Sequence, residues 1–207
     1  YHGLKKLREN PMVGIRQLMT YSKKERDWNI SDIVFFLGPR INAAGRLKHA
    51  KEAVAVLMGK SAYLEELAQD LEDTNERRKE EEKKIVESAY DHIRTDENFH
   101  NKTSIVLYSP TWNKGVIGIV ASKLVETYYK PTVLLTKAEP YIVGSCRSVH
   151  DFDMYEALQQ CQEYLVQFGG HKFAAGLTLQ EEQLENFIAH FERFCDANLQ
   201  QHQKKPV

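Results

Sequence analysis

Residues 61–101 contain neither glycine nor proline, and this predicts one long helix. The first part of the segment carries leucines at helical spacing, whereas residues 76–84 are all charged, with four Glu against five Lys or Arg. Because a helix with so little apolar surface has no face to bury, we interpret the segment as a solvent-exposed connector between two packed bodies. The alternative is the solvated face of a helix in a bundle. We place the domain boundary in this segment.

The pattern before the connector predicts short helices. Residues 3–21 give two of them, separated by the Asn-Pro pair at 10–11. The Ser-Asp pair at 31–32 is expected to cap a short apolar helix, which the Gly-Pro pair at 38–39 ends. A further apolar helix is predicted over residues 50–58. This part of the chain is therefore expected to be helical.

The pattern after the connector changes to an α/β alternation. Short apolar runs predict strands, and amphipathic stretches predict helices. The expected strands are residues 104–108, 131–136, 141–148 and 174–179, and the expected helices are residues 115–129, 153–168 and 181–199. Asp153 is expected to cap the second of these helices, with Glu156 as the other half of a capping box. The predicted fold class is α/β, with a small mixed sheet flanked by helices.

Composition limits the classes of function. The 207 residues carry a formal net charge of −1, so a nucleic-acid site must be a local patch and not a global basic field. The odd set of Cys146, Cys161 and Cys195 lacks metal-site spacing and indicates reduced thiols in a cytoplasmic protein. No run is apolar enough for a membrane span or a signal peptide. Because the chain opens at Tyr1 without Met, we expect it to be an excised fragment.

The predicted strand 141–148 carries a candidate phosphate site. Side chains alternate across a strand, so Ser145 and Arg147 are expected to share one face about 7 Å apart. A hydroxyl and a guanidinium at this spacing can hold one phosphate, and Ser148 follows directly in the same run. Gly144 would leave room for a ligand. The alternative is that Arg147 pairs with a carboxylate and Gly144 only eases packing.

Two glycine-containing segments are further candidates. Gly169 and Gly170 are expected to end the helix 153–168 and present amides to an anion, with His171 donating to a phosphate or leaving oxygen. The alternative makes His171 an ordinary loop residue. Residues 112–118 precede the predicted helix 115–129, whose N-terminus could attract an anion. Close packing of small residues on a sheet explains this second segment equally well.

The segment 38–46 contains two arginines and several small residues. If it is helical after the proline, Asn42, Arg46 and His49 line one face. Arg40 and Arg46 in one such turn favour phosphate contact, although bonds from an arginine to carbonyl groups are the alternative. By contrast, the acidic run at 150–153 only imitates a metal cluster, because Asp153 is explained as a cap. A metal site built by this chain alone is not expected.

In this order, four motifs resemble the RecJ family of the DHH phosphoesterase superfamily. They are Gly-Pro-Arg-Ile-Asn-Ala-Ala-Gly-Arg at 38–46, Trp-Asn-Lys-Gly-Val-Ile-Gly-Ile-Val-Ala-Ser at 112–122, Gly-Ser-Cys-Arg-Ser at 144–148 and Phe-Gly-Gly-His-Lys-Phe-Ala-Ala-Gly-Leu at 168–177. The likeness spans the chain from Gly3 to about Phe194. Many relatives have His where this chain has Asn113, which leaves the role of that side chain open.

The resemblance implies a division of the chain. Residues 1–60 would be the helical end of an upstream catalytic domain, and residues 61–101 a connecting helix. Residues 102–199 would be the substrate-binding α/β domain, and residues 200–207 a tail. The Asp/His set that binds Mn²⁺ or Mg²⁺ in relatives is absent here. The oligonucleotide-binding barrel that many full-length members carry is not seen.

The resemblance also implies a function. The intact enzyme would hydrolyse single-stranded DNA from the 5′ end in DNA repair and recombination, as a monomer that could meet single-strand-binding protein. Ser145 and Arg147 are implied to hold the 5′ phosphate, Gly169 to His171 to face the reacting phosphate, and Arg40 and Arg46 to contact phosphates. The alternatives are a phosphodiesterase of short oligonucleotides or cyclic dinucleotides, and a non-catalytic relative that binds DNA at a replication fork.

Overall fold

The computed structural model describes residues 1–22, 24, 27–150 and 152–199, and it separates into two compact units. The N-terminal unit is Tyr1–Glu80 and the C-terminal unit is Glu81–Val207. Within the described residues, no helix has both the length and the apolar composition that crossing a membrane requires. Each unit has its own apolar core, so each is described by itself.

The N-terminal unit is helical, as predicted. Its helices are α1 (His2–Glu9), α2 (Val13–Met19), α3 (Ile30–Asp32), the π-helical turn η1 (Ile33–Leu37), α4 (Gly38–Leu47), α5 (Lys51–Met58) and the first part of α6 (Leu64–Thr95). The break between α1 and α2 falls at Pro11, where the sequence places it. The core is formed by residues of these helices and the loop before α3, among them Leu18, Trp28, Val56 and Leu71.

The start of α3 differs from the prediction. The cap is Asn29, whose side-chain oxygen accepts from the backbone N–H of Ser31 at 2.8 Å and of Asp32 at 3.3 Å. Asp32 is the other half of this capping box, because its carboxylate accepts from the N–H of Asn29 at 2.7 Å. The predicted Ser-Asp cap was therefore wrong by two positions, and the helix gains a full reciprocal cap.

Gly38 and Pro39 do not end the helix, which is a second correction. The helix runs on from α3 through η1 into α4. The N–H of Gly38 donates to the carbonyl of Ile33, five residues back, in the wider π turn. Pro39 is the second residue of α4 and follows directly on this wider turn, where the regular spacing of backbone hydrogen bonds is already interrupted. The widened turn replaces the expected break.

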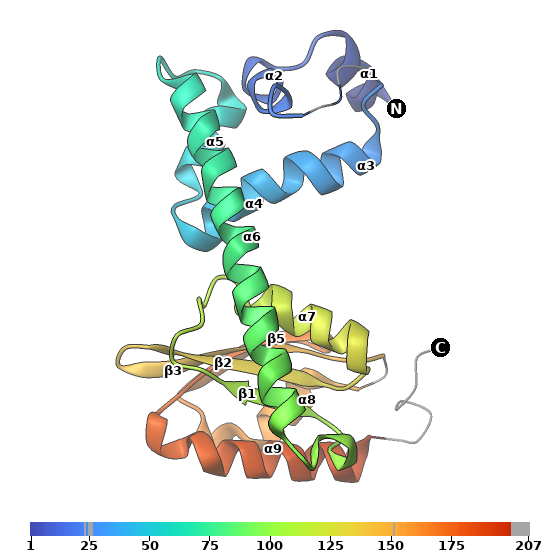
Figure 1. Cartoon of the computed structure of the whole chain (residues 1–207), viewed down its shortest axis with the longest axis vertical. Coiled ribbons are helices and arrows are strands. Elements are labelled where there is room, and N and C mark those ends of the chain that lie inside the picture. Colours follow the sequence, from blue (N-terminus) through green and yellow to red (C-terminus); the bar gives the residue numbers. More distant parts are fainter. Residues whose placement is uncertain (23, 25–26, 151, 200–207) are drawn as a thin grey trace. The chain divides into compact units, whose positions relative to one another are not determined.

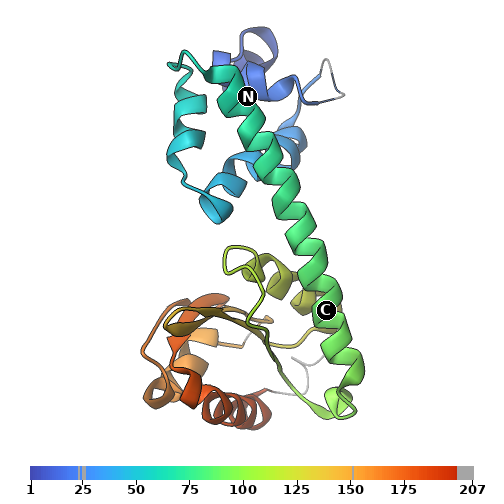
Figure 2. The ribbon, with the colours of Figure 1, turned by 60° about the vertical axis from the view of Figure 1, so that its left-hand side comes forward.

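The long helix α6 contributes to both units. It is unbroken over 32 residues, Leu64–Thr95, and appears as the green helix of Figure 2. Ala68 and Leu71 are buried in the N-terminal unit, and Ile85 and Ala89 are buried in the C-terminal unit. Its charged middle carries ion pairs three residues apart, such as Lys84 with Glu81 at 2.8 Å.

The C-terminal unit is built on one five-stranded mixed sheet, which confirms the predicted fold class. The strands are β1 (Ile105–Tyr108), β2 (Thr132–Ala138), β3 (Tyr141–Arg147), β4 (Gln167–His171) and β5 (Ala174–Leu179), in the order β1-β2-β3-β5-β4. Strands β1 and β2 are parallel and are joined through α7 (Ile117–Tyr128), whereas all other neighbours are antiparallel.

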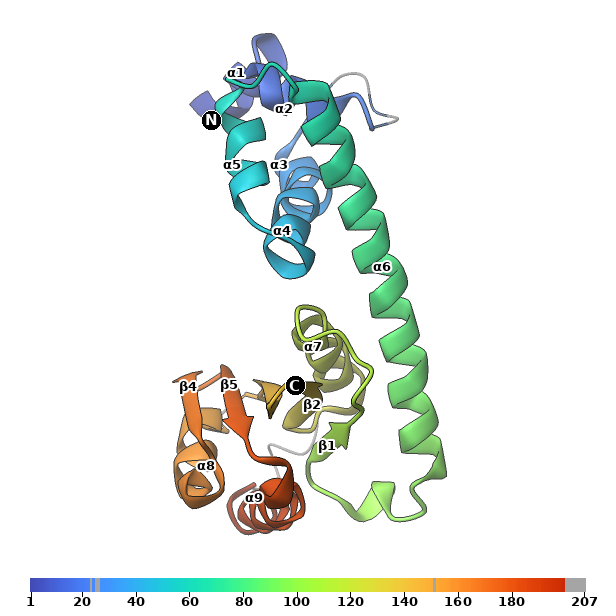
Figure 3. The same ribbon diagram turned by 90° about the vertical axis from the view of Figure 1, so that its left-hand side faces the viewer.

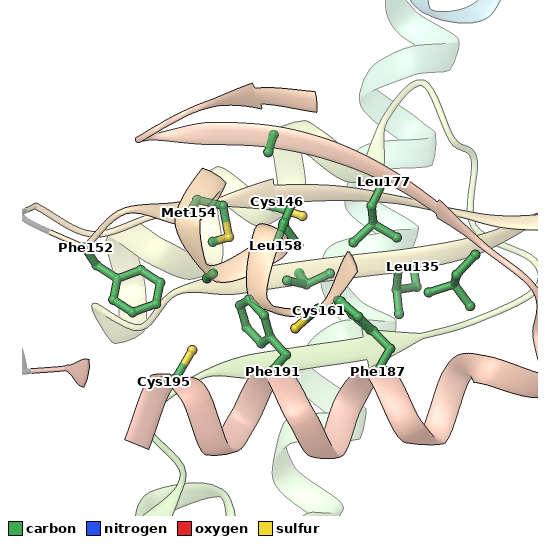
Figure 4. Packing of buried hydrophobic residues seen from close by; sticks show 14 of the residues in the cluster. Leu135, Cys146, Phe152, Met154, Leu158, Cys161, Leu177, Phe187, Phe191 and Cys195 are labelled. Carbon is green, nitrogen blue, oxygen red and sulfur yellow. The ribbon is translucent and has the colours of Figure 1, made fainter. Parts of the chain in front are cut away.

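Helices cover the sheet unequally on its two faces. Figure 1 shows α7 on one face and α8 (Met154–Gln160) with α9 (Leu184–Asn198) on the other. The face toward α8 and α9 holds the apolar core, where Phe187 and Phe191 of α9 meet Leu135 and Leu177 of the strands (Figure 4). Three short 3₁₀ turns, Phe99–Asn101, Gln162–Tyr164 and Glu181–Gln183, complete the unit.

The helix predicted over residues 153–168 is wrong beyond its first two turns. Asp153 caps α8 as predicted, accepting from the N–H of Tyr155 and of Glu156, but α8 ends at Gln160. The chain then forms β4, so Gly169, Gly170 and His171 lie on an edge strand and not in a helix-ending turn. The apolar spacing of this stretch suits a helix, but pairing with β5 satisfies the backbone and overrides that local preference.

Candidate functional site

The strand register gathers several of the predicted site residues on one face of the sheet. Ser145 is paired with Gly176 of β5, and Gly176 is paired with Gly169 of β4. In the next row, Arg147 is paired with Ala174, and Ala174 is paired with His171. Directly paired residues point to the same face.

This face is opposite to the apolar core. Cys146, which alternates with Ser145 and Arg147 along β3, is fully buried in the core. Burial raises the pKa of its thiol to about 12. Ser145, Arg147, Gly169, Gly176 and His171 therefore share the face away from Cys146, and Cys146 is excluded as a nucleophile there.

Arg147 is held in place by its neighbours. Its Nε donates to the hydroxyl of Ser122 in α7 at 3.2 Å. One Nη donates to the hydroxyl of Ser145 at 3.1 Å and to the carbonyl of Cys146 at 2.7 Å. Because these bonds fix the guanidinium while the residue stays partly exposed, Arg147 can meet an anion with little further ordering.

The first turn of α7 lies directly against this pair. A Cβ atom placed on Gly118 would be 2.8 Å from the Ser145 hydroxyl and 3.0 Å from an Nη of Arg147. The backbone of the helix N-terminus therefore comes as close as the absence of a side chain allows. The backbone N–H groups of Ile117 and Ile119 already donate to carbonyls of this turn, so the contribution of this helix end is its dipole, which favours negative charge. Helix end, guanidinium and hydroxyl together are a candidate anion site.

The turn before α7 is built by Asn113 and Trp112. The side-chain oxygen of Asn113 accepts from the N–H of Gly115 at 2.9 Å, and its carbonyl accepts from Val116 at 2.9 Å and Ile117 at 3.1 Å. Trp112 is buried, and its indole N–H donates to the hydroxyl of Ser88 in α6 at 3.2 Å. Asn113 thus shapes the start of α7, and Trp112 fastens that start to the connecting helix.

His171 lies at the exposed end of β4. Its Nδ1 accepts from the backbone N–H of Phe173 at 3.2 Å across the β4–β5 turn. In the neutral ring the proton is therefore on Nε2, which can donate to an oxygen of a ligand. Gly170 alternates onto the other face of the hairpin, with a φ of 149°. It shapes the strand, whereas Gly169 lies on the same face as His171.

The remaining predicted residues do not join this cluster. The hydroxyl of Ser148 donates to the carbonyl of Phe152 at 2.8 Å, which fastens the loop after β3. Arg40 is buried in the N-terminal unit, where it pairs with both carboxylate oxygens of Glu72 and donates to the carbonyl of Phe36 at 2.8 Å. Arg40 thus has a structural role within its own unit.

Asn42 and Arg46 remain exposed on α4. They are four residues apart in the helix and therefore share one face, as predicted. His49 lies beyond the end of α4 at Leu47 and is not on that helical face. Asn42 and Arg46 belong to the N-terminal unit and form no part of the cluster on the sheet.

The residues that the structure describes gather no group of three His, Cys, Asp or Glu side chains that could hold a metal ion. Asp153 of the acidic run serves as the cap of α8, and Asp151 lies outside the described residues. The described donor set therefore does not fit a metal centre.

Two contributors were missed as individual residues. Gly118 and Ser122 lie one helical turn apart on α7, and both contact the Ser145–Arg147 pair. Their spacing of four residues indicates a shared helix face, but nothing in the sequence says which strand that face meets. Only the packing of α7 on β3 brings these four residues together.

Comparison with known proteins gives a consistent result. The DHHA1 domain family matches residues 101–197. The single-stranded-DNA-specific exonuclease RecJ of Bacillus subtilis is 34% identical over 99% of this chain and 26% of its own length. The RecJ of Haemophilus influenzae is 33% identical over 90% of this chain and 34% of its own length. The chain thus spans about a quarter to a third of these relatives.

The solved structures agree with the sequences. The crystal structure of RecJ from Thermus thermophilus in complex with Mn²⁺ superposes with a TM-score of 0.82 at 29% identity, over 94% of this chain and 28% of that one. An exonuclease RecJ bound to manganese gives a TM-score of 0.78 at 30% identity, over 94% of this chain and 48% of that one. The matches cover 94% to 99% of this chain and therefore include both of its units. The chain belongs to the RecJ family.

Proposed function

We propose that this chain is the strand-binding part of a single-stranded-DNA-specific exonuclease that degrades DNA from the 5′ end. The observation that carries the proposal is the anion site formed by Ser145, Arg147 and the first turn of α7. The names of the relatives support the substrate class.

In this proposal the anion site holds the terminal 5′ phosphate. Arg147 offers guanidinium N–H groups, and the Ser145 hydroxyl can turn to donate to a phosphate oxygen. Ser122 and the Cys146 carbonyl hold the guanidinium before the ligand arrives, which lowers the entropic cost of binding. The Nε2–H of His171, in the same row of the sheet as Arg147, would donate to the phosphate that reacts.

Metal chemistry is assigned to another part of the protein. Since the described residues do not fit a metal centre, we derive no step through Mn²⁺ or Mg²⁺ from them. RecJ structures were solved with both ions, which supports divalent metal use by the full-length enzyme. The isolated chain is expected to show no nuclease activity with manganese, and 5′ digestion by the purified chain would contradict this assignment.

The division of labour along the chain follows the same proposal. Residues 1–60 would complete an upstream catalytic domain, residues 61–101 would connect it, and residues 102–199 would bind the strand. The predicted tail, residues 200–207, lies outside the described residues. Within the first part, exposed Asn42 and Arg46 are retained as phosphate contacts, whereas Arg40 is not, because Glu72 already binds it. A monomeric cytoplasmic enzyme of DNA repair and recombination that meets single-strand-binding protein completes the proposal.

The substitution Arg147→Ala in the full-length protein tests the anion site. Hydrogen bonds to a charged group contribute about 1.5–3 kcal/mol, so affinity for 5′-phosphorylated single-stranded DNA should fall by about 10-fold to 150-fold. Affinity for the same strand with a 5′ hydroxyl should change little. Binding is measured by fluorescence anisotropy in a chelator, so that the strand is not degraded.

Arg193→Ala is the matched control for this experiment. Arg193 lies on α9, on the opposite side of the sheet, and its Nε donates to the carbonyl of Ala189, one helical turn back, at 3.3 Å. This variant should bind both strands as the unchanged protein does. If Arg147→Ala kept its preference for the 5′ phosphate, the proposed clamp would be wrong.

A further inference from the structure

A hollow of about 380 Å³ lies on the sheet next to the anion site. Residues of three neighbouring strands line it, namely Val143 and Gly144 of β3, Gln167, Phe168 and Gly169 of β4, and Gly176, Leu177 and Thr178 of β5. Val143, Thr178 and Gln167 form one cross-strand row, and the adjoining row is Ser145, Gly176 and Gly169. The hollow is therefore continuous with the Ser145 and Arg147 side of the sheet.

This part of the sheet is left uncovered within the C-terminal unit. The helix α7 packs on β2 and β3, whereas α8 and α9 lie on the other face. Figure 3 shows β4 and β5 at the edge of the sheet that lies away from α7. Gln167, Gly169 and Gly176 are exposed, so a ligand can reach the hollow.

The fold does not require glycine at the two positions that form its floor. A Cβ on Gly169 would meet nothing within 4 Å, and a Cβ on Gly176 would meet only the Gly144 carbonyl at an ordinary 3.6 Å. Glycine weakens a strand compared with other residues, so the fold gains no stability from glycine at these two positions. Gly144 and Gly170 differ, since a Cβ on either would come within 2.7 Å of neighbouring atoms.

The polar groups around the hollow are uncharged. The side-chain amide of Gln167 donates to the hydroxyl of Thr178 at 3.3 Å. An amide and a hydroxyl both offer donor and acceptor atoms, which suit the sugar and the base of a nucleotide better than its phosphate. Because an amide can pair with donors or acceptors, such an edge would accept any of the four bases.

We propose that this hollow binds the 5′-terminal nucleoside of the DNA strand, whose phosphate is held by Ser145 and Arg147. The inference rests on the proposed function and adds a second subsite to it. The flat floor of Gly169 and Gly176 receives one ring, and Gln167 hydrogen-bonds to its edge. The nucleoside is held by shape and uncharged contacts, so the subsite has no sequence preference.

The test uses the full-length protein in a chelator and two 5′-phosphorylated oligonucleotides. One strand is intact, and the other has an abasic analogue as its 5′-terminal nucleoside. A stacked base contributes on the order of 1–3 kcal/mol, so the unchanged protein should bind the abasic strand about tenfold more weakly. Gly176→Val should bind the intact strand about tenfold more weakly and should lose nothing further with the abasic strand.

Controls separate filling of the hollow from damage to the fold. Val166→Leu enlarges an exposed side chain that alternates onto the other face from Gln167, and this variant should bind like the unchanged protein. Gly176→Ala adds one methyl group at an unstrained distance and should give a smaller loss at an unchanged melting temperature. Should the valine variant fail to fold, Gly176→Ala and Gln167→Leu with both strands decide the question.

Two outcomes overturn the inference, and they are distinct from failure of the proposed function. The subsite is refuted if Gly176→Val binds the intact strand as tightly as the unchanged protein does. It is also refuted if the abasic strand lowers the affinity of both proteins by the same factor. The phosphate site stands if Arg147→Ala still weakens binding in that case. If neither Arg147→Ala nor Gly176→Val weakens binding, the assignment of strand binding to this face fails as well.

Discussion

A single missing methyl group sets the geometry of the anion site. Gly118→Ala would place a Cβ 2.8 Å from the Ser145 hydroxyl and 3.0 Å from an Nη of Arg147, so one of these groups must move. Alanine is favourable in a helix, and folding should be retained. We expect affinity for a 5′-phosphorylated strand to fall about tenfold, less than for Arg147→Ala, because the charge remains.

Gly3→Ala is the matched control for that substitution. Gly3 is also helical, and a Cβ there would meet nothing within 4 Å. This variant should be at least as stable as the unchanged protein and should bind the strand equally well. Equal binding by Gly118→Ala and Gly3→Ala would show that the close approach of α7 has no part in gripping the phosphate.

The residue scale also shows what the sequence can and cannot predict. Strand alternation alone placed Ser145 and Arg147 on one face, because the two-residue period is local. The partner of Arg40 was not predictable in this way, since Glu72 is 32 positions further along the chain. The same holds for Ser122 and Arg147, which meet only when α7 packs on β3.

At the scale of elements, the edge strand β4 depends on one glycine. Gly170 has a φ of 149°, and a Cβ there would lie 2.4 Å from the carbonyl oxygen of Ala174. Gly170→Ala should therefore destabilise the protein by about 1–3 kcal/mol, the cost of such a backbone conformation for a residue with a side chain. The measurement is the free energy of unfolding in urea.

Gly169→Ala is the neighbouring comparison for this prediction. The space above Gly169 is open and its backbone conformation is ordinary, so alanine should leave stability unchanged or raise it slightly. The two substitutions add the same methyl group to adjacent residues of one strand. Equal losses of stability for Gly169→Ala and Gly170→Ala would contradict the explanation from the backbone conformation of Gly170.

The elements that sequence patterns missed are those fixed by distant partners. Alternating and helical periods located β1, β2, β3, β5 and α7 to within a few residues. β4 was predicted as the end of a helix and the glycine turn after it, because only the register with β5 reveals it as a strand. The helix through Pro39 was missed because a π turn accommodates the proline, and no local sequence pattern predicts such a turn.

On the scale of the whole molecule, the α/β class followed from the change of pattern after the connecting helix, and the structure bears it out. The domain limits of 60, 101 and 199 remain a prediction. α6 shows why such limits are difficult to place, since one unbroken helix supplies buried residues to both units. A charged surface marks where a helix is solvated, but it does not mark where one unit ends.

The three thiols of the C-terminal unit report on its core as a whole. Cys146 comes from β3, Cys161 follows α8 and Cys195 belongs to α9, and all three are buried in one cluster (Figure 4). Burial raises the pKa of Cys146 and of Cys161 to about 12, and it also raises the pKa of Cys195. At neutral pH all three should resist iodoacetamide in the folded protein and react together once the unit unfolds.

The same burial predicts how stability depends on pH. An unfolded thiol ionises near pH 8.5, roughly, whereas the folded Cys146 and Cys161 keep their protons to about pH 12. Between these values the unfolded state binds fewer protons than the folded one, so the free energy of unfolding must fall as pH rises.

The control is a triple variant with the substitutions Cys146→Ala, Cys161→Ala and Cys195→Ala. It is needed because lysine and tyrosine groups also titrate in this pH range, so the contribution of the thiols is the difference between the two proteins. That variant should be less stable at pH 7, because it loses buried volume, but its stability should fall less steeply from pH 9 to 11 in urea unfolding. Parallel slopes for the two proteins would show that the thiols are not buried in the folded unit, and the core of Figure 4 would then need to be redrawn.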